Sequence, residues 1–421
     1  MSFFSKIFKS KNSEPLLALD IGTEVAKALV FQVDQESKKC VVNGVGRARQ
    51  RLGNMQSGAV SDINGVIDTA REAITAATGM AKIKKIRKAI VGIAGELVKG
   101  TTTTVHYERA YPESKIELAE LKTIIQKVQA KAYERIKKQL AWETCQNEID
   151  INLVNAAIVD VRIDGYRVMS PLGFQGREVS ISVFNAYAPM IHYGALKTIA
   201  DELDIDLINI AAEPYAVARS IGIDEDNLDF SAIFIDIGGG TTDIAVVRNG
   251  GLEGTKMFAL GGRAFTKRLA YELGVSFEEA ENLKIKYSLN KLPNDVGKKV
   301  EEILDEDCYI WLSGVEISLS EFTENDLLPS KILLCGGGSA LPGIKKALSS
   351  SEWTKNLQFS KSPEINFLQP RDLIHMLDST GELKNPQDVT PMSLANLVLE
   401  MKTEEKTLAG ILRRAVQNVQ N

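Results

Sequence analysis

Three glycine-rich turns carry the residues of this sequence whose types and spacing could do chemistry. Each follows a short apolar run, so a strand would deliver it to the edge of a sheet. The turns hold Gly22 and Thr23 in the first, Gly238, Gly239, Gly240, Thr241, Thr242 and Asp243 in the second, and Gly336, Gly337, Gly338 and Ser339 in the third. Glycine lets backbone N–H groups approach phosphate oxygens closely, and Asp20 beside the first turn can hold a hydrated Mg²⁺. The pattern indicates a site for a phosphate-bearing ligand.

The second turn, residues 235–243, is the most specific of the three. Three successive glycines between two apolar strands cost about 0.5–1 kcal/mol each relative to alanine. A plain hairpin needs one or two glycines, so we expect this backbone to approach a ligand closely, with Gly239 at a positive φ. The pattern GxxxxGK[ST] of a P-loop is missing from the sequence, as is a GxGxxG fingerprint after the first strand.

Two strand–turn–strand hairpins position these turns. Residues 16–20 and 25–33 flank the first turn, and residues 232–236 and 243–248 flank the second in the same pattern. We interpret this repetition as an internal duplication into two halves. The third turn follows a strand at 332–334 and precedes Pro342, which is well placed in the first turn of a helix.

The remaining periodicity predicts an α/β protein with a small α+β insert. A helix expected over 116–143 has a stripe of leucine, isoleucine and valine, and β-branched residues at 101–105 predict a strand. We expect a basic leader at 1–15, a first domain at 16–83 and 178–228, an inserted subdomain at 84–177, a second domain at 229–385, a polar linker at 386–403 and an amphipathic helix at 404–421.

Composition excludes several classes of protein. The formal net charge of −5 argues against a general nucleic-acid binder. The four cysteines show no CxxC spacing and there are three histidines, so neither a zinc site nor a disulfide framework is expected. A reducing compartment, the cytoplasm, fits this cysteine usage.

Taken together, the three turns resemble those of the actin-like ATPase superfamily, in which two duplicated ribonuclease-H-like domains close over ATP. The resemblance implies ATP and Mg²⁺ as cofactors, with Asp20 and Asp236 organising the metal ion. It implies that Glu213, in the Glu-Pro step before the second hairpin, lies near the attacking water. It further implies that Glu281 and Lys284 contact the ribose and adenine.

Within that superfamily, the closer resemblance is to the FtsA family of bacterial cell division. It is carried by residues 61–63, 91–95, 171–177, 213–214 and 281–287 and by the insert at 84–177. It implies a scaffold that polymerises into filaments, turns ATP over slowly and binds the C-terminal peptide of FtsZ. The segment between Lys286 and Ile332 is shorter than is usual in FtsA. In this respect, and at 274–281, the chain resembles PilM, the FtsA relative of type IV pilus assembly.

Both ends of the chain have the pattern of a membrane anchor. Phe3, Phe4, Ile7 and Phe8 share one helical face amid lysines, and 404–421 repeats the pattern with Leu408, Ile411, Leu412, Val416 and Val419. We expect an anionic membrane surface as a partner, on the inner face of the cell membrane. A disordered leader and a C-terminal helix packed on its own domain are the alternatives.

A true enzyme of the same fold is the third functional class. A sugar kinase would need a catalytic base and sugar-binding residues that the sequence does not reveal. A folding chaperone would need a substrate domain after about residue 385, where too little chain remains. The sequence therefore favours the division scaffold, with the PilM-like adaptor as the alternative.

Overall fold

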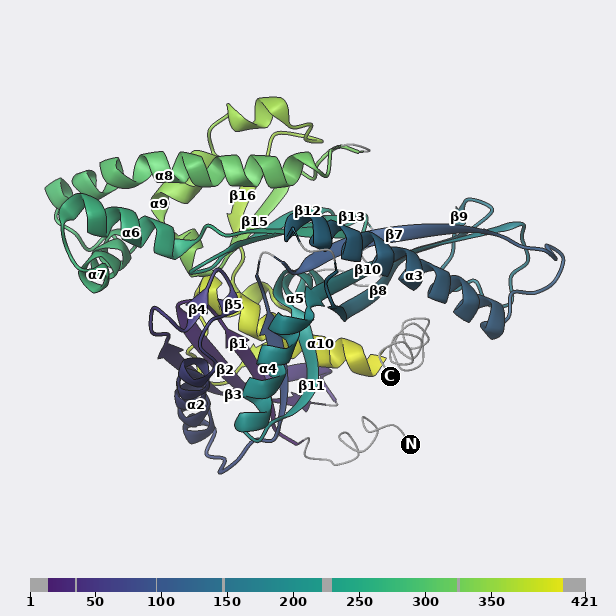
Figure 1. Cartoon of the computed structure of the whole chain (residues 1–421), viewed down its shortest axis with the longest axis horizontal. Coiled ribbons are helices and arrows are strands. Elements are labelled where there is room, and N and C mark those ends of the chain that lie inside the picture. The colour runs from purple at the N-terminus through teal and green to yellow at the C-terminus, as the bar shows by residue number, and fades with distance from the viewer. Residues whose placement is uncertain are drawn as a thin grey trace.

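The computed structural model describes residues 14–34, 36–95, 97–145, 148–221, 229–323 and 326–403. The expected anchors, with Phe3, Phe4, Ile7 and Phe8 at one end and the 404–421 helix at the other, lie outside the described residues. Figure 1 shows two sheets stacked one above the other, with an elongated α+β arm extending from the upper one.

The first half is built on a six-stranded sheet in the order β11-β6-β1-β2-β3-β17. Its strands are β1 (Leu16–Ile21), β2 (Val25–Asp34), β3 (Lys39–Arg49), β6 (Lys88–Ile93), β11 (Asp206–Ala212) and β17 (Met376–Asp378). β1, β2 and β3 form an antiparallel meander, whereas β6 and β11 run parallel to β1. All six residues of β1 are buried, because helices cover both faces of this sheet.

Four helices cover that sheet. α2 (Ile63–Met80) packs on β2 and β3 and contacts α4 (Met190–Glu202). α10 (Val389–Thr403) packs on β1, β2 and β6 and contacts α5 (Glu213–Ser220). A two-stranded hairpin of β4 (Met55–Gln56) and β5 (Ala59–Val60) follows β3.

The second half repeats this arrangement within a nine-stranded sheet, ordered β16-β15-β12-β13-β14-β7-β10-β8-β9. β12 (Ala232–Ile237), β13 (Thr242–Arg248) and β14 (Gly251–Phe258) form the antiparallel meander, and β15 (Lys331–Cys335) lies parallel to β12, as β6 does to β1. β16 (Glu364–Phe367) forms the edge. The shared topology is what the predicted duplication requires.

Helices α6 (Gly262–Leu273), α7 (Phe277–Ser288), α8 (Asn294–Ser320) and α9 (Pro342–Leu348) belong to the second half. α8 lies along the sheet in Figure 1 and buries Trp311 completely in the core that it shares with β12, β13 and β15. Short 3-10 turns complete this half and its return to the first: η1 (Gly337–Ala340), η2 (Trp353–Asn356), η3 (Pro370–Asp372) and η4 (Pro386–Asp388).

The arm consists of β7 (Lys99–Glu108), β8 (Ile151–Ile163), β9 (Tyr166–Arg167), β10 (Glu178–Pro189) and α3 (Leu118–Glu143). It has its own core, in which Leu121, Ile125 and Val128 of α3 pack on Val179 and Ile181. The arm's sheet joins the second half through two residue pairs between β7 and β14.

Three expected domain boundaries are wrong. β6 belongs to the first sheet although it lies within 84–177, because its apolar run is buried against β1 and β11. β10 belongs to the arm although it begins at Glu178. β17 already pairs with β3, so the chain returns to the first half before residue 385.

The expected polar linker over 386–403 is also wrong. Most of this segment forms α10, in which Val389, Leu394, Ala395, Leu397 and Val398 are buried. These apolar residues surround the helix rather than forming one stripe, which is the pattern of a fully buried helix.

We predict that Gly46→Ala destabilises the first half. A Cβ at Gly46 would lie 1.9 Å from the Ala73 carbonyl oxygen and 2.7 Å from the Ala77 nitrogen, so α2 would be pushed off β3. Overpacking of this kind typically costs about 1–3 kcal/mol. Thermal unfolding should show a melting temperature several degrees lower. Gly53→Ala is the control, because nothing lies within 4 Å of its Cβ position. Equal melting temperatures for Gly46→Ala and wild type would contradict this packing.

Candidate functional site

The first and second glycine turns lie against each other where the two halves meet. A Cβ on Gly239 would be 2.8 Å from the Glu24 Cβ, and a Cβ on Gly240 would be 2.7 Å from the Thr23 Oγ1. Both glycines are therefore required by close approach of the two hairpins. The expectation of a positive φ at Gly239 is wrong, because Gly239 is not among the positive-φ glycines.

The third turn packs on the second. Gly336 has a φ of 80°, and a Cβ there would lie 2.1 Å from the Asp236 Oδ1. Gly337 and Gly338 begin η1, and Ser339 is buried with its hydroxyl donating to the Gly336 carbonyl at 2.7 Å. The three turns are thus contiguous, although more than 300 residues separate the first from the third.

Carboxylates gather beneath these turns. Asp20 at the end of β1, Asp236 at the end of β12, Asp243 in β13 and Glu213 at the start of α5 are all buried. Buried strands carry them there, since Asp20, Glu213 and Asp236 each follow a run of buried residues and Asp243 precedes one. Lys27 reaches in from β2, with its Nζ 2.8 Å from the Asp20 Oδ2.

Burial raises the pKa values of three carboxyl groups in this cluster. Burial, with the nearby carboxylates of Asp20, Asp243 and Asp236, raises the pKa of Glu213 well above its usual value. Burial and then Asp236 likewise raise the pKa of Asp243. The pKa of Asp236 is raised by burial, against the opposing effects of a Thr390 hydrogen bond and of Lys27.

For Lys27, in contrast, the cluster favours the charged form. Burial disfavours its charged form, but the adjacent Asp20 carboxylate, assisted by Asp236 and Glu213, outweighs burial and raises the pKa of Lys27. Its ammonium therefore stays charged in the native protein. As far as the described residues go, one ammonium faces four carboxyl groups in this cluster, so full ionisation of the four would leave buried negative charge unpaired.

Thr241 and Thr242 point in different directions. The Thr241 hydroxyl donates to the Asp243 Oδ2 at 3.3 Å, inside the cluster. The Thr242 hydroxyl instead donates to the Leu260 carbonyl and accepts from the Trp311 Nε1 at 2.9 Å, so it anchors α8. The structure therefore directs Thr242, one of the expected ligand contacts, toward the core of the second half.

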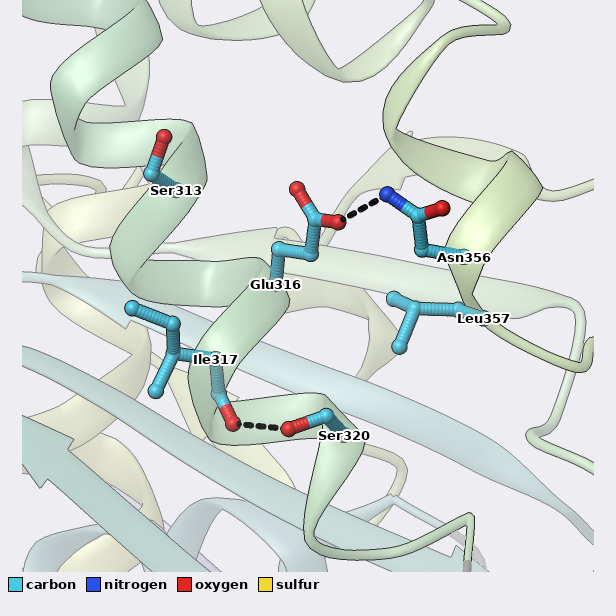
Figure 2. A pocket seen from close by; sticks show the side chains of 6 residues that line it. All are labelled: Ser313, Glu316, Ile317, Ser320, Asn356 and Leu357. Carbon is cyan, nitrogen blue, oxygen red and sulfur yellow. Dashed lines mark hydrogen bonds between the residues drawn. The ribbon is translucent and has the colours of Figure 1, made fainter.

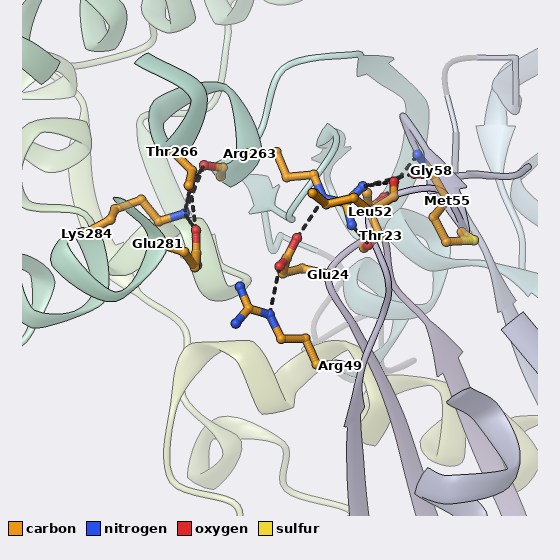
Figure 3. Close-up of polar contacts among 11 residues, drawn as sticks. Thr23, Glu24, Arg49, Leu52, Met55, Gly58, Arg263, Thr266, Glu281 and Lys284 are labelled. Atoms are coloured by element: carbon orange, nitrogen blue, oxygen red, sulfur yellow. Dashed lines mark hydrogen bonds and ion pairs between the residues drawn. The ribbon is translucent and has the colours of Figure 1, made fainter. Parts of the chain in front are cut away.

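Glu281 and Lys284 lie on α7 beside the second turn. The Lys284 Nζ is 2.8 Å from the Glu281 carboxylate and donates to the Gly262 carbonyl at 2.9 Å and to the Thr266 hydroxyl at 2.8 Å (Figure 3). The Gly262 N–H in turn donates to the Gly238 carbonyl at 2.9 Å. Glu281 and Lys284 thus form an ion pair with each other, and Lys284 is linked through Gly262 to the second glycine turn.

Two members of the site escaped the sequence analysis. Lys27 is a lysine within the buried strand run of β2, a signal that could have been noticed. Thr390 donates its hydroxyl to the Asp236 Oδ2 from α10, within the segment expected to be a linker. Nothing local marks Thr390, because its proximity to Asp236 arises only when the chain returns to the first half.

The donor set fits a hydrated magnesium ion rather than a cage made by the protein. Within the described parts of the chain, no group of three or more histidine, cysteine, aspartate or glutamate side chains is arranged to hold a metal. The Asp243 Oδ1 is buried and has no hydrogen-bond partner among the described residues. Mg²⁺ commonly takes one or two carboxylates and completes its shell with water and phosphate oxygens.

A separate hollow of about 350 Å³ lies between α8 and η2 (Figure 2). It is lined by Ser313, Glu316, Ile317, Ser320, Asn356 and Leu357, and the Asn356 amide donates to Glu316 at 2.9 Å. No residue expected to bind ligand lies in its wall. The chemistry is therefore concentrated at the glycine turns.

Comparison with known proteins shows what this chain is similar to. The family model described as cell division protein FtsA matches residues 233–391, which include the second and third turns. The chain is 26% identical over 387 residues to cell division protein FtsA of Bacillus subtilis strain 168, covering 86% of this chain and 81% of the relative. It is 25% identical over 353 residues to cell division protein FtsA of Pseudomonas aeruginosa PAO1, covering 79% and 80%.

A solved structure titled PilM-PilN type IV pilus biogenesis complex matches with a TM-score of 0.62 and 16% identity, over 91% of this chain and 98% of that chain. At this identity the match speaks for the fold alone. The resemblance to FtsA and the expected actin-like fold are both confirmed. The chain is similar to FtsA over most of its length and has the actin-like fold.

Proposed function

We propose that this chain is an ATP-binding division scaffold, with Mg²⁺-ATP held between its two halves. The observation that carries the proposal is the buried cluster of Asp20, Glu213, Asp236 and Asp243, which meets three glycine turns at the junction of the halves. Buried carboxylates in excess over cations are costly unless a cation joins them. A magnesium ion would supply that charge, and the backbone N–H groups of the glycine turns would meet the negative charge of the nucleotide's phosphates.

Each residue has a role that follows from its place. Asp20 and Asp236 would hold water molecules of the metal's shell, and Thr390 orients the Asp236 carboxylate. The glycine turns, with Thr23 and Thr241, would offer donors to the phosphates. Gly336, Gly337, Gly338 and Ser339 would face the adenosine, and Glu281 with Lys284 would contact the ribose and adenine. Bound Mg²⁺ would supply charge stabilisation for the leaving phosphate.

Glu213 would orient the water that attacks the terminal phosphate. Burial and the neighbouring carboxylates of Asp20, Asp243 and Asp236 raise its pKa, which favours a role in accepting a hydrogen bond or proton from that water. The resemblance to FtsA implies slow hydrolysis, so that nucleotide would act mainly to hold the two halves together.

As a scaffold, the protein would self-associate into filaments and bind the C-terminal peptide of FtsZ, linking the division ring to the membrane. Support comes from relatives that are named cell division protein FtsA. Among the described residues, no helix is long and apolar enough to span a bilayer. Attachment would use the terminal apolar stripes at the cytoplasmic membrane surface, where many weak anchors on one filament add by avidity.

A PilM-like adaptor of pilus assembly is the second candidate. Its support is the short segment between Lys286 and Ile332 and the resemblance at 274–281, whereas the match to the PilM-PilN complex shows only that the fold is shared. The two candidates share the nucleotide site and differ in the peptide that they bind.

We predict that the full-length protein retains FtsZ and that FtsZ without its C-terminal peptide is not retained. Immobilised protein should be offered both forms of FtsZ and, separately, a short cytoplasmic peptide of PilN. Retention of the PilN peptide alone would overturn the division role and leave the adaptor.

We also predict that Asp243→Asn stabilises the ligand-free protein at alkaline pH. Because the native pKa of Asp243 is raised, ionising it opposes folding, and this penalty grows as pH rises from the unfolded pKa of about 4. The melting temperature at pH 8 should rise by about 2–4 °C, which corresponds to about 1 kcal/mol in a large domain. The gain should shrink toward pH 5.

Asp378→Asn is the matched control with the opposite sign. Although burial opposes it, hydrogen bonds from Thr380 and Leu383 lower the pKa of Asp378. Its carboxylate therefore stabilises the fold above its unfolded pKa, and the variant should melt lower at pH 8. If Asp243→Asn also melts lower at pH 8, the carboxylate cluster is not under charge strain.

A further inference from the structure

Arg263 crosses from the second half to the first. It is the second residue of α6, and its side chain is 11% exposed. The Nε donates to the Glu24 carboxylate at 2.6 Å and an Nη to the Thr23 carbonyl at 2.7 Å. The other Nη donates to the carbonyls of Met55 at 2.9 Å and Leu52 at 3.4 Å. Figure 3 shows this guanidinium extending to the first turn and to the loop that precedes β4.

The base of Arg263 is fixed to the second turn. Its own N–H donates to the Gly239 carbonyl at 2.7 Å, and the preceding Gly262 N–H donates to Gly238. One residue therefore holds the second turn through its backbone and the first turn through its side chain. The two turns that would enclose the phosphates are joined by it.

The acceptors in the first half are themselves held in place. The Glu24 carboxylate also accepts from the Arg49 Nε at 3.2 Å, and the Glu24 carbonyl accepts from the Gln50 N–H at 2.9 Å. The Thr23 hydroxyl accepts from the Gly58 N–H at 3.1 Å. Arg263 thus docks into a preformed set of acceptors.

We propose that Arg263 is a positioning residue that clamps the two phosphate turns together and sets the rate at which nucleotide leaves. The inference rests on the proposed binding of ATP between the halves. For the turns to separate, the charge-assisted bonds to Glu24 and Thr23 must break in a poorly hydrated place, which slows opening. Lysine would be a poor substitute, since it lacks the planar fork that serves acceptors in several directions.

Further contacts between the halves lie elsewhere around the site, and α5 packs on β12, β13 and β14. Thr390 of α10 reaches Asp236, and the Gly336 N–H donates to the Pro386 carbonyl of η4 at 3.2 Å. These last two contacts involve the segment by which the chain returns to the first half. Loss of Arg263 would therefore remove the charged link between the turns while this connection persists.

The test measures release of a fluorescent ATP analogue, preloaded with Mg²⁺ and displaced by excess ATP in a stopped-flow instrument. Arg263→Ala should release it about tenfold faster or more, with association little changed. Arg263→Lys and Glu24→Gln, which keep part of the contact, should lie between that variant and wild type. Arg268→Ala is the control on the same helix, because Arg268 pairs with Glu272 and Glu306 within the second half.

A second readout needs no nucleotide. Spin labels on cysteines placed at exposed Glu72 of α2 and Glu278 of α7 report the separation of the halves. Cys145→Ser is the background, since the other three cysteines are buried. Arg263→Ala should lengthen and broaden the distances, and Arg268→Ala should not. Unchanged release and unchanged distances would overturn the clamp. If wild type binds no nucleotide, the proposed function fails, and the distances alone judge the clamp.

Discussion

Buried negative charge at the junction of the two halves is the constraint on which the rest of the structure depends. Asp20 and Asp236 end equivalent strands of the two sheets, and Glu213 begins the helix between them. Carboxylates in such positions oppose folding unless they are paired, protonated or joined by a cation. The charged ammonium of Lys27 compensates part of this negative charge. The uncompensated part contributes to the raised pKa values of Glu213 and Asp243.

The glycines make this junction possible. At Gly239 and Gly240 the two hairpins approach so closely that a methyl group would collide with Glu24 or Thr23. At Gly336 the positive φ and the contact with Asp236 have the same effect for the third turn. The backbone thus forms the walls of the site, and the side chain of Arg263 connects the wall of the second half to that of the first.

The two hairpins and the helix of the arm were predictable from the sequence because each depends on a local pattern of residues. The apolar runs and turns defined both hairpins, and the stripe of α3 defined the arm's helix. What could not be predicted depends on the tertiary path. α10 was missed because its apolar residues surround the helix, and Thr390 with it. Arg263 looked like an ordinary basic residue at a helix start, since its acceptors lie more than 200 residues away.

The central claim is that a magnesium-bound nucleotide lies between the two phosphate turns. Calorimetric titration of ATP into the protein, with Mg²⁺ and with a chelator, tests it most directly, alongside Gly239→Val and the control Gly53→Val. Binding should require Mg²⁺, persist in Gly53→Val and be lost in Gly239→Val, whose Cβ would lie 2.8 Å from the Glu24 Cβ. Equal affinity in Gly239→Val, or binding that ignores Mg²⁺, would contradict the account.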